Sequence, residues 1–147
     1  MRTRILTATL VALAPLAVLA PPAQAAAGPV LFSRVFFDSP GSDTGTNASL
    51  NAEYFTLKNS GTDTKNISGW SVKDVTGYRY TFGTFSLKGG ASVTVHTGKG
   101  TNTASHRYWG RGSYVWNNTG DTAYLHTSAG TQQDRCSFSG AGDYTNC

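Results

Sequence analysis

The sequence predicts an all-β protein, an antiparallel sandwich or barrel of about eight short strands. Short runs of alternating or β-branched residues recur, and turn residues separate them at intervals of about 8–12 residues. No stretch of ten residues has the apolar periodicity of an amphipathic helix. Glutamate occurs once, at Glu53, and strong helix formers are scarce beyond the N-terminal segment. A chain of 147 residues without internal repeats fits one domain.

The expected strands lie between turn signals such as Asn59-Ser60-Gly61 and Gly89-Gly90. In chain order they cover residues 30–37, 53–58, 67–75, 78–82, 93–97, 113–116, 122–127 and 131–138. The polar stretches 42–51 and 101–112 show no periodicity, so we expect loops there.

The N-terminal segment has the pattern of a secretory signal peptide. A positive stretch at residues 1–4 precedes an apolar run at residues 5–20, and Ala23-Gln24-Ala25 supplies the small residues of a cleavage site. We expect residues 1–25 to be removed after Ala25, leaving residues 26–147 as a secreted, extracellular domain without a membrane span. The alternative is a membrane anchor, but Pro15 interrupts the run, which is shorter than the roughly 20 residues that span a bilayer.

The two cysteines, Cys136 and Cys147, are expected to form a disulfide. An even number of cysteines in an exported chain favours pairing, because the compartment is oxidising. A structural zinc site is not expected, since it requires four ligands and no histidine lies near these cysteines.

The charge balance excludes a strongly basic nucleic-acid-binding protein. Without Arg2 and Arg4, ten basic residues face eight acidic ones, and the net charge falls from +4 to +2. Most of the basic residues are scattered through strands and turns, and we interpret them as ordinary solubilising charges. They are Lys58, Lys65, Lys73, Arg79, Lys88 and Lys99.

Residues 106–114 form the most suggestive candidate binding segment. Its basic and aromatic residues alternate, namely Arg107, Tyr108, Trp109 and Arg111. Such side chains can stack on sugar rings or bases and pair with phosphates. The alternative is that the aromatic residues cover one end of the sandwich while the arginines are solvated.

No catalytic, metal or cofactor site is expected. The loop with Asp38, Asp43 and Asn47 lacks the ligand spacing of an EF-hand, and we interpret Asp121 and Asp134 as turn and surface residues. The three histidines lie in no catalytic motif, and neither a Gly-x-Ser-x-Gly elbow nor a His-Glu-x-x-His motif occurs. A small hydrolase with two catalytic carboxylates remains the less favoured alternative, because such a pair is defined in space rather than in sequence.

Several blocks in fixed order resemble the lamin tail domain family. They cover residues 53–61, 67–74, 80–82, 87–95 and 115–125, and they include Trp70 and Trp116 as expected core residues. The resemblance implies an immunoglobulin-like β-sandwich. The chain lacks the coiled-coil rod, basic import signal and prenylated C-terminus of nuclear lamins, so it is similar to the free-standing secreted bacterial form.

Together these features predict a secreted, non-enzymatic binding module. Its partner is expected to be a cell-wall polymer, extracellular nucleic acid or a protein. The alternative is a structural protein that self-associates through exposed sheet edges.

Overall fold

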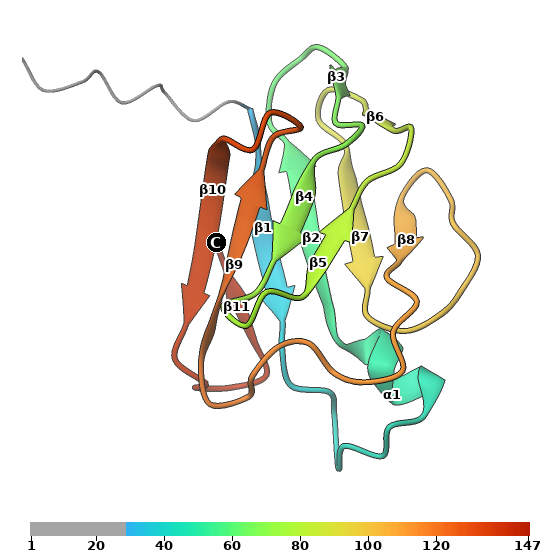
Figure 1. Ribbon diagram of the computed structural model, residues 1–147, viewed down its shortest axis with the longest axis vertical. Coiled ribbons are helices and arrows are strands. Elements are labelled where there is room, and N and C mark those ends of the chain that lie inside the picture. Colours follow the sequence, from blue (N-terminus) through green and yellow to red (C-terminus); the bar gives the residue numbers. More distant parts are fainter. Residues whose placement is uncertain (1–28) are drawn as a thin grey trace, which may run out of the picture.

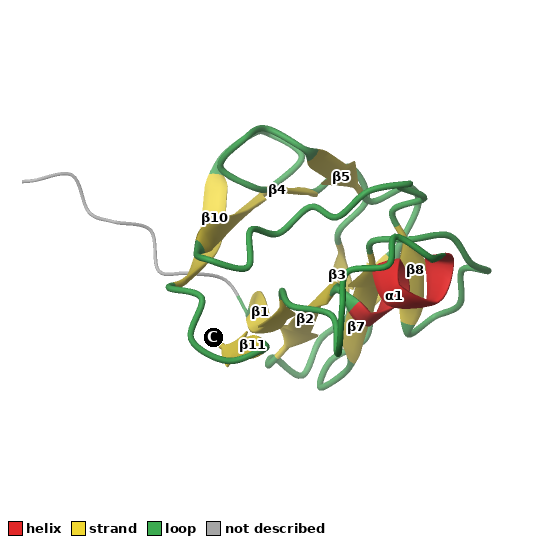
Figure 2. Ribbon diagram, turned by 90° about the horizontal axis from the view of Figure 1, so that it is seen from below, coloured by secondary structure: helices red, strands yellow, loops and turns green. Residues whose placement is uncertain are grey.

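The structure is a computed structural model that describes residues 29–147. Its main elements are two facing sheets (Figures 1 and 2). In spatial order, the five-stranded sheet contains β11 (Tyr144–Asn146), β1 (Val30–Phe36), β2 (Tyr54–Asn59), β7 (Ser92–His96) and β8 (His106–Tyr108). The four-stranded sheet contains β10 (Gln132–Phe138), β9 (Asp121–His126), β4 (Ser71–Lys73) and β5 (Arg79–Thr81). The short pair β3 (Lys65–Asn66) and β6 (Ser86–Leu87) forms a third sheet.

The core lies between the two large sheets, as expected from the alternating strands. In β2, Phe55 and Leu57 are fully buried, whereas the alternate residues Tyr54, Thr56 and Lys58 are not. Phe55 meets the ring of Trp116 edge to face, with a centroid distance of 6.3 Å. The predicted core position of Trp116 is therefore confirmed, while Trp70 is only partly buried against the core.

Three local expectations were wrong. Within residues 42–51, expected as a loop, a helix α1 (Asn47–Ala52) begins after Thr46, whose side chain accepts the N–H of Ser49. Within the expected loop at residues 101–112, β8 pairs with β7 in parallel, so the sheets are not wholly antiparallel. Residues 113–116, expected as a strand, join no sheet. Instead they belong to the segment that crosses one end of the sandwich between β8 and β9 (Figure 1).

The predicted disulfide between Cys136 and Cys147 is confirmed, with Cα atoms 5.6 Å apart. Cys136 lies on β10, and Cys147 directly follows β11, so the bond joins one sheet to the edge of the other. The predicted signal peptide and its cleavage site after Ala25 lie outside the described residues. Over residues 29–147, no helix has the length and apolar character needed to cross a membrane.

Candidate functional site

Successive side chains of the predicted binding segment point to opposite faces of β8, so the segment does not present one surface. His106 and Tyr108 lie on the outer face of the five-stranded sheet, while the residues between and after them turn toward the other sheet. Trp109 packs against the core, and its ring centroid lies 6.4 Å from that of Phe55 and 6.2 Å from that of Trp116. Trp109 is therefore first of all a packing residue.

The two arginines of this segment lie over aromatic rings near β5. The guanidinium of Arg107 is 4.3 Å from the ring centroid of Phe85, and that of Arg111 is 3.9 Å from the centroid of Tyr78. Arg111 also donates to the hydroxyl of Ser113. The structure thus does not bring Arg107, Tyr108, Trp109 and Arg111 together on one surface. It places both arginines at the edge of the four-stranded sheet.

A row of cations crosses the outer face of that sheet. Arg79 on β5 is the cross-strand partner of Lys73 on β4. Lys73 is in turn the partner of Tyr124 on β9, whose other partner is Arg135 on β10. Cross-strand partners point to the same face of a sheet, so these four side chains form one continuous row. Arg79 and Arg135 are exposed, and Lys73 and Tyr124 are half-buried.

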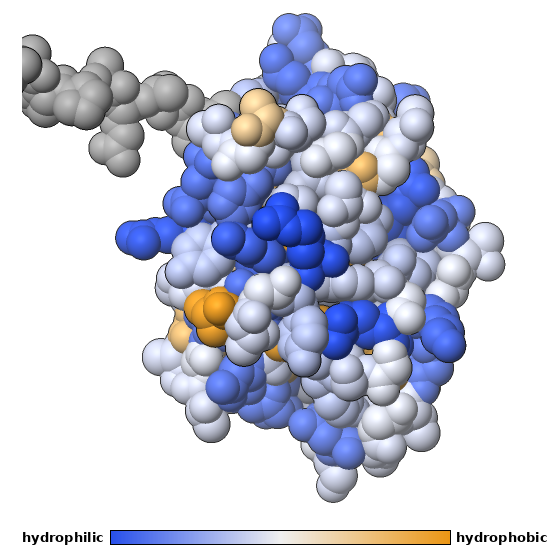
Figure 3. Space-filling model, in the orientation of Figure 1, coloured by the Kyte–Doolittle hydropathy of each residue, from blue (hydrophilic) through white to orange (hydrophobic). Residues whose placement is uncertain are grey.

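A second row of neutral residues runs beside the cations. Its members are, in order across the strands, Thr81, Ser71, His126 and Gln132. Arg79 donates to the hydroxyl of Ser71 at 2.7 Å, and the ammonium of Lys73 lies 5.9 Å from the ring centroid of Tyr124. We call the two rows together the basic face. Figure 3 views it from outside and shows strongly hydrophilic side chains gathered over its middle.

Two aspartates close in sequence to the basic face accept hydrogen bonds from the backbone. Asp74 is 1% exposed and accepts the backbone N–H groups of Gly77 and Tyr78 at 2.8 and 2.7 Å. Asp134 accepts the backbone N–H of Phe32 in the opposite sheet at 2.9 Å. Both carboxylates are therefore engaged by the backbone.

The local electrostatics reflect this excess of positive charge. Burial lowers the pKa of His126, and the neighbouring charges of Lys73 and Arg79 lower it further. Lys73, Tyr124, His126 and Gln132 also line a hollow of about 260 Å³, together with Asp74 and Val75 of the β4–β5 turn.

The role of Glu53 in the fold was not predictable from its sequence position, although it is the one glutamate of the chain. Glu53 is fully buried, and its Oε1 accepts the backbone N–H groups of Val115 and Trp116 at 2.9 and 2.5 Å. Burial raises the pKa of Glu53 to about 7, against the opposing effect of these N–H donors. Glu53 therefore fixes the segment that crosses the end of the sandwich.

Two aspartates also differ from expectation. Asp121, expected as a turn or surface residue, is 7% exposed and accepts the backbone N–H groups of Asn117 and Thr122 at 3.2 and 2.7 Å. Asp134, expected at the surface, is half-buried and joins the two sheets. The carboxylates of Glu53, Asp74 and Asp121 thus serve the backbone. In the loop considered for calcium, Asp38 and Asp43 both accept from the amide of Asn118.

Comparison with known proteins independently supports the β-sandwich fold. The family model of the Lamin Tail Domain matches residues 23–140, a range that contains every strand except β11. The comparison with curated proteins finds no match to this chain. The immunoglobulin-like β-sandwich that the sequence blocks implied is therefore confirmed, and the family indicates an interaction module. The chain belongs to the lamin tail domain family.

Proposed function

We propose that the protein is an exported binding module that uses the basic face to hold a phosphodiester polymer. The observation that carries the proposal is the row of Arg79, Lys73, Tyr124 and Arg135 across the four strands, in which three of the four side chains are cations. Like charges on directly opposite strands, such as Arg79 and Lys73, destabilise a sheet unless an anion lies between them. An anionic partner removes this repulsion. The row therefore destabilises the free protein and is stabilised when an anion binds.

The dimensions of the row fit a linear polyanion. Three inter-strand steps of about 4.8 Å separate Arg79 from Arg135, so the row is about 14 Å long. An extended polymer lying along it can place successive phosphates near successive cations. Tyr124, half-buried in the middle of the row, adds an apolar contact for a base or for a polyol carbon chain.

The edge of the sheet extends the positive surface. Arg111 lies on the ring of Tyr78, the residue before Arg79, so its charge continues the row beyond β5. Two kinds of polymer outside a cell carry the required phosphodiester backbone: nucleic acids and the glycerol-phosphate polymers of cell walls. The charge of only a few cations predicts modest affinity, in the range of about 10⁻⁶ to 10⁻⁴ M for non-specific binding.

The test compares two variants with the same net charge. The first carries Lys73→Gln, Arg79→Gln and Arg135→Gln on the basic face. The control carries Lys58→Gln, Lys65→Gln and Lys88→Gln, which replace three exposed cations elsewhere. Binding is measured at low salt by fluorescence anisotropy, once with labelled oligothymidylate and once with labelled polyglycerol phosphate.

The expected result is that the first variant binds at least tenfold more weakly than the control variant. Binding of one polymer but not the other identifies the source of the phosphodiester backbone. Equal losses in both variants would mean that net charge rather than the basic face decides binding. A wild-type protein that binds neither polymer at low salt would contradict the proposed function.

A further inference from the structure

The outer face of the five-stranded sheet carries a row of aromatic rings from one edge to the other. Successive cross-strand partners are Tyr144, Phe36, Tyr54, His96 and Tyr108. Neighbouring ring centroids in this row are between 5.1 and 5.7 Å apart. Rings that pack on one another in this way stabilise a sheet and form a rigid apolar ridge.

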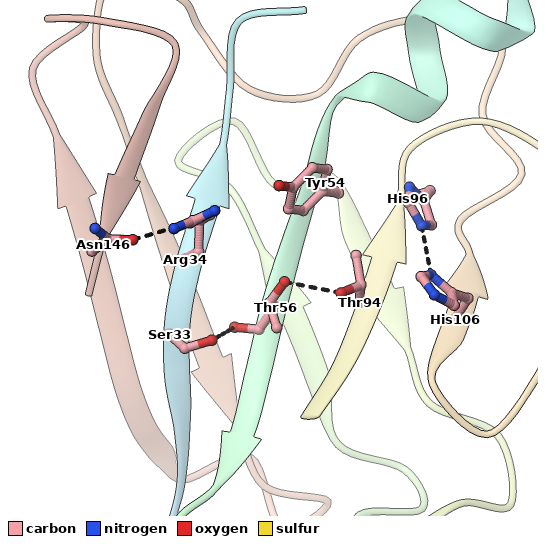
Figure 4. A pocket seen from close by; sticks show the side chains of 8 residues that line it. All are labelled: Ser33, Arg34, Tyr54, Thr56, Thr94, His96, His106 and Asn146. Carbon is pink, nitrogen blue, oxygen red and sulfur yellow. Dashed lines mark hydrogen bonds between the residues drawn. The ribbon is translucent and has the colours of Figure 1, made fainter. Parts of the chain in front are cut away.

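A row of polar side chains runs beside this ridge, two residues away along each strand. Its members are Asn146, Arg34, Thr56, Thr94 and His106, again as successive cross-strand partners. Four inter-strand steps give this row a length of about 19 Å. An open hollow of about 450 Å³, which we call the outer groove, lies over the polar row and is bordered by Tyr54 and His96 of the aromatic row (Figure 4).

Arg34 supplies a cation at one end of the outer groove. A register shift between Phe32 and Arg34 places Ser33 and Arg34 together at the groove, as β-bulges do. The Nε of Arg34 donates to the side chain of Asn146 at 3.0 Å, and the guanidinium lies 4.6 Å from the ring centroid of Tyr144. Its two Nη groups remain for a planar anion, and none of the eight side chains that line the groove is acidic.

The histidine pair defines a hydrogen-bond acceptor at the other end. The Nδ1 of His96 lies 2.7 Å from the backbone carbonyl of Asn51, which can only accept, so this nitrogen carries the proton. Burial lowers the pKa of His96 and favours the neutral ring, whose Nε2 then accepts. The Nδ1 of His106, 3.0 Å away, must donate to it. In neutral His106 the Nε2 is left as an acceptor for a hydroxyl group of a ligand.

The middle of the groove offers hydroxyl groups beside an apolar wall. The hydroxyls of Thr56 and Thr94 lie 3.0 Å apart, and the ring of Tyr54 borders them (Figure 4). A ligand that matches the whole groove has a carboxylate at one end, hydroxyl groups along its length and C–H surfaces that touch the aromatic ridge. Acidic oligosaccharides combine all three features.

We propose that the outer groove binds a short oligosaccharide containing a uronic acid. The carboxylate pairs with the Nη groups of Arg34, and a sugar hydroxyl donates to Nε2 of His106. The remaining hydroxyls exchange hydrogen bonds with Thr56 and Thr94. The groove lies on the sheet opposite to the basic face, so this site is independent of the proposed function and gives the module two ligand surfaces.

The test measures the binding of trigalacturonate by isothermal titration calorimetry, with its fully methyl-esterified form as the uncharged ligand control. Arg34→Gln is expected to weaken the binding of trigalacturonate at least tenfold. Lys58→Gln, which removes an equal charge from an exposed residue of β2, is expected to change it less than twofold. Thr94→Val keeps the size of the side chain in β7 but removes its hydroxyl, and it is expected to weaken the binding of trigalacturonate several-fold.

If Arg34→Gln does not fold, the esterified ligand still tests the proposal, because it lacks the carboxylates that Arg34 is proposed to bind. The wild-type protein is expected to bind the ester at least tenfold more weakly than the acid. Equal binding of ester and acid, or no binding of trigalacturonate, would overturn the proposal. So would loss of trigalacturonate binding in the variant Lys73→Gln, Arg79→Gln, Arg135→Gln, since the sugar would then occupy the basic face.

Discussion

The carboxylate of Glu53 accepts the backbone N–H of Trp116, 63 residues further along the chain. The same oxygen accepts the N–H of Val115. These two bonds replace the strand pairing that residues 113–116 lack, and they hold the indole of Trp116 at 3% exposure against Phe55. One buried side chain thereby closes one end of the sandwich.

Replacing Glu53 with alanine is expected to destabilise the protein by about 2–4 kcal/mol. The change leaves two buried N–H groups without an acceptor, and such groups cost about 1–3 kcal/mol each. The measurement is urea-induced unfolding followed by tryptophan fluorescence. A loss below about 1 kcal/mol would show that Glu53 does not hold this segment.

The stability of the protein is expected to fall as the pH rises from about 4.5 to about 7. Burial raises the pKa of Glu53 from 4.5 to about 7, so in this window the folded state binds a proton that the unfolded state has released. The stabilisation from protonated Glu53 is complete below the pKa of Glu53 in the unfolded state. It is lost as the pH rises through the pKa of Glu53 in the folded state. A shift of this size corresponds to up to about 3 kcal/mol.

Glu53→Gln isolates this contribution, because its amide oxygen can still accept both N–H groups while no proton is exchanged. The difference in unfolding free energy between wild type and variant is measured at about pH 5 and about pH 8. The wild-type protein is expected to lose more stability between these values than the variant. Parallel pH profiles would contradict the shifted pKa.

Trp109→Ala is expected to lower the free energy of unfolding by about 3 kcal/mol, as for other large aromatic residues packed against a core. Trp109→Phe keeps much of the contact with Phe55 and Trp116 and is expected to retain most of that stability. The measurement is chemical denaturation of both variants. If Trp109→Ala unfolds at the same urea concentration as the wild type, Trp109 is free for ligand binding, as the sequence first indicated.

Reduction of the Cys136–Cys147 disulfide is expected to cost about 3 kcal/mol, because it opens a short loop with a sequence separation of 11. The loss should concentrate at β11, which is only three residues long and ends beside Cys147. Hydrogen exchange checks this: the amide groups of β11 should exchange faster in the variant Cys136→Ala, Cys147→Ala. Unchanged exchange at β11 would show that strand pairing alone holds the C-terminus.

The sequence predicted the strands that have strong alternation, because burial of one face determines that pattern. β1, β2, β7, β9 and β10 all lie within one or two residues of their expected ranges. It could not predict β8, which is only three residues long and becomes a strand by pairing with β7. The six-residue helix α1 could not be predicted either, because it is too short to show the apolar periodicity of a helix.

The candidate surfaces were harder to predict than the strands, because they depend on register between strands that are distant in sequence. Lys73, Arg79 and Arg135 were scattered charges in the sequence. Only the pairing of β4 with β5 and β9, and of β9 with β10, brings them into one row. Arg107 and Trp109 were adjacent to Tyr108 in the chain, and the alternation of β8 separated them. The pairing Cys136–Cys147 could be predicted because the chain has only two cysteines.

The salt dependence of binding tests the basic face most directly. Each phosphate that a cation neutralises on a single strand adds about −0.7 to the slope of log Kobs against log salt, so three cations predict a slope of about −2. We expect this slope for oligothymidylate with the wild-type protein and with the control variant Lys58→Gln, Lys65→Gln, Lys88→Gln. The variant Lys73→Gln, Arg79→Gln, Arg135→Gln should show a slope no steeper than about −0.7, because Arg111 is the one cation of the proposed surface that it keeps. An unchanged slope in that variant would contradict the account.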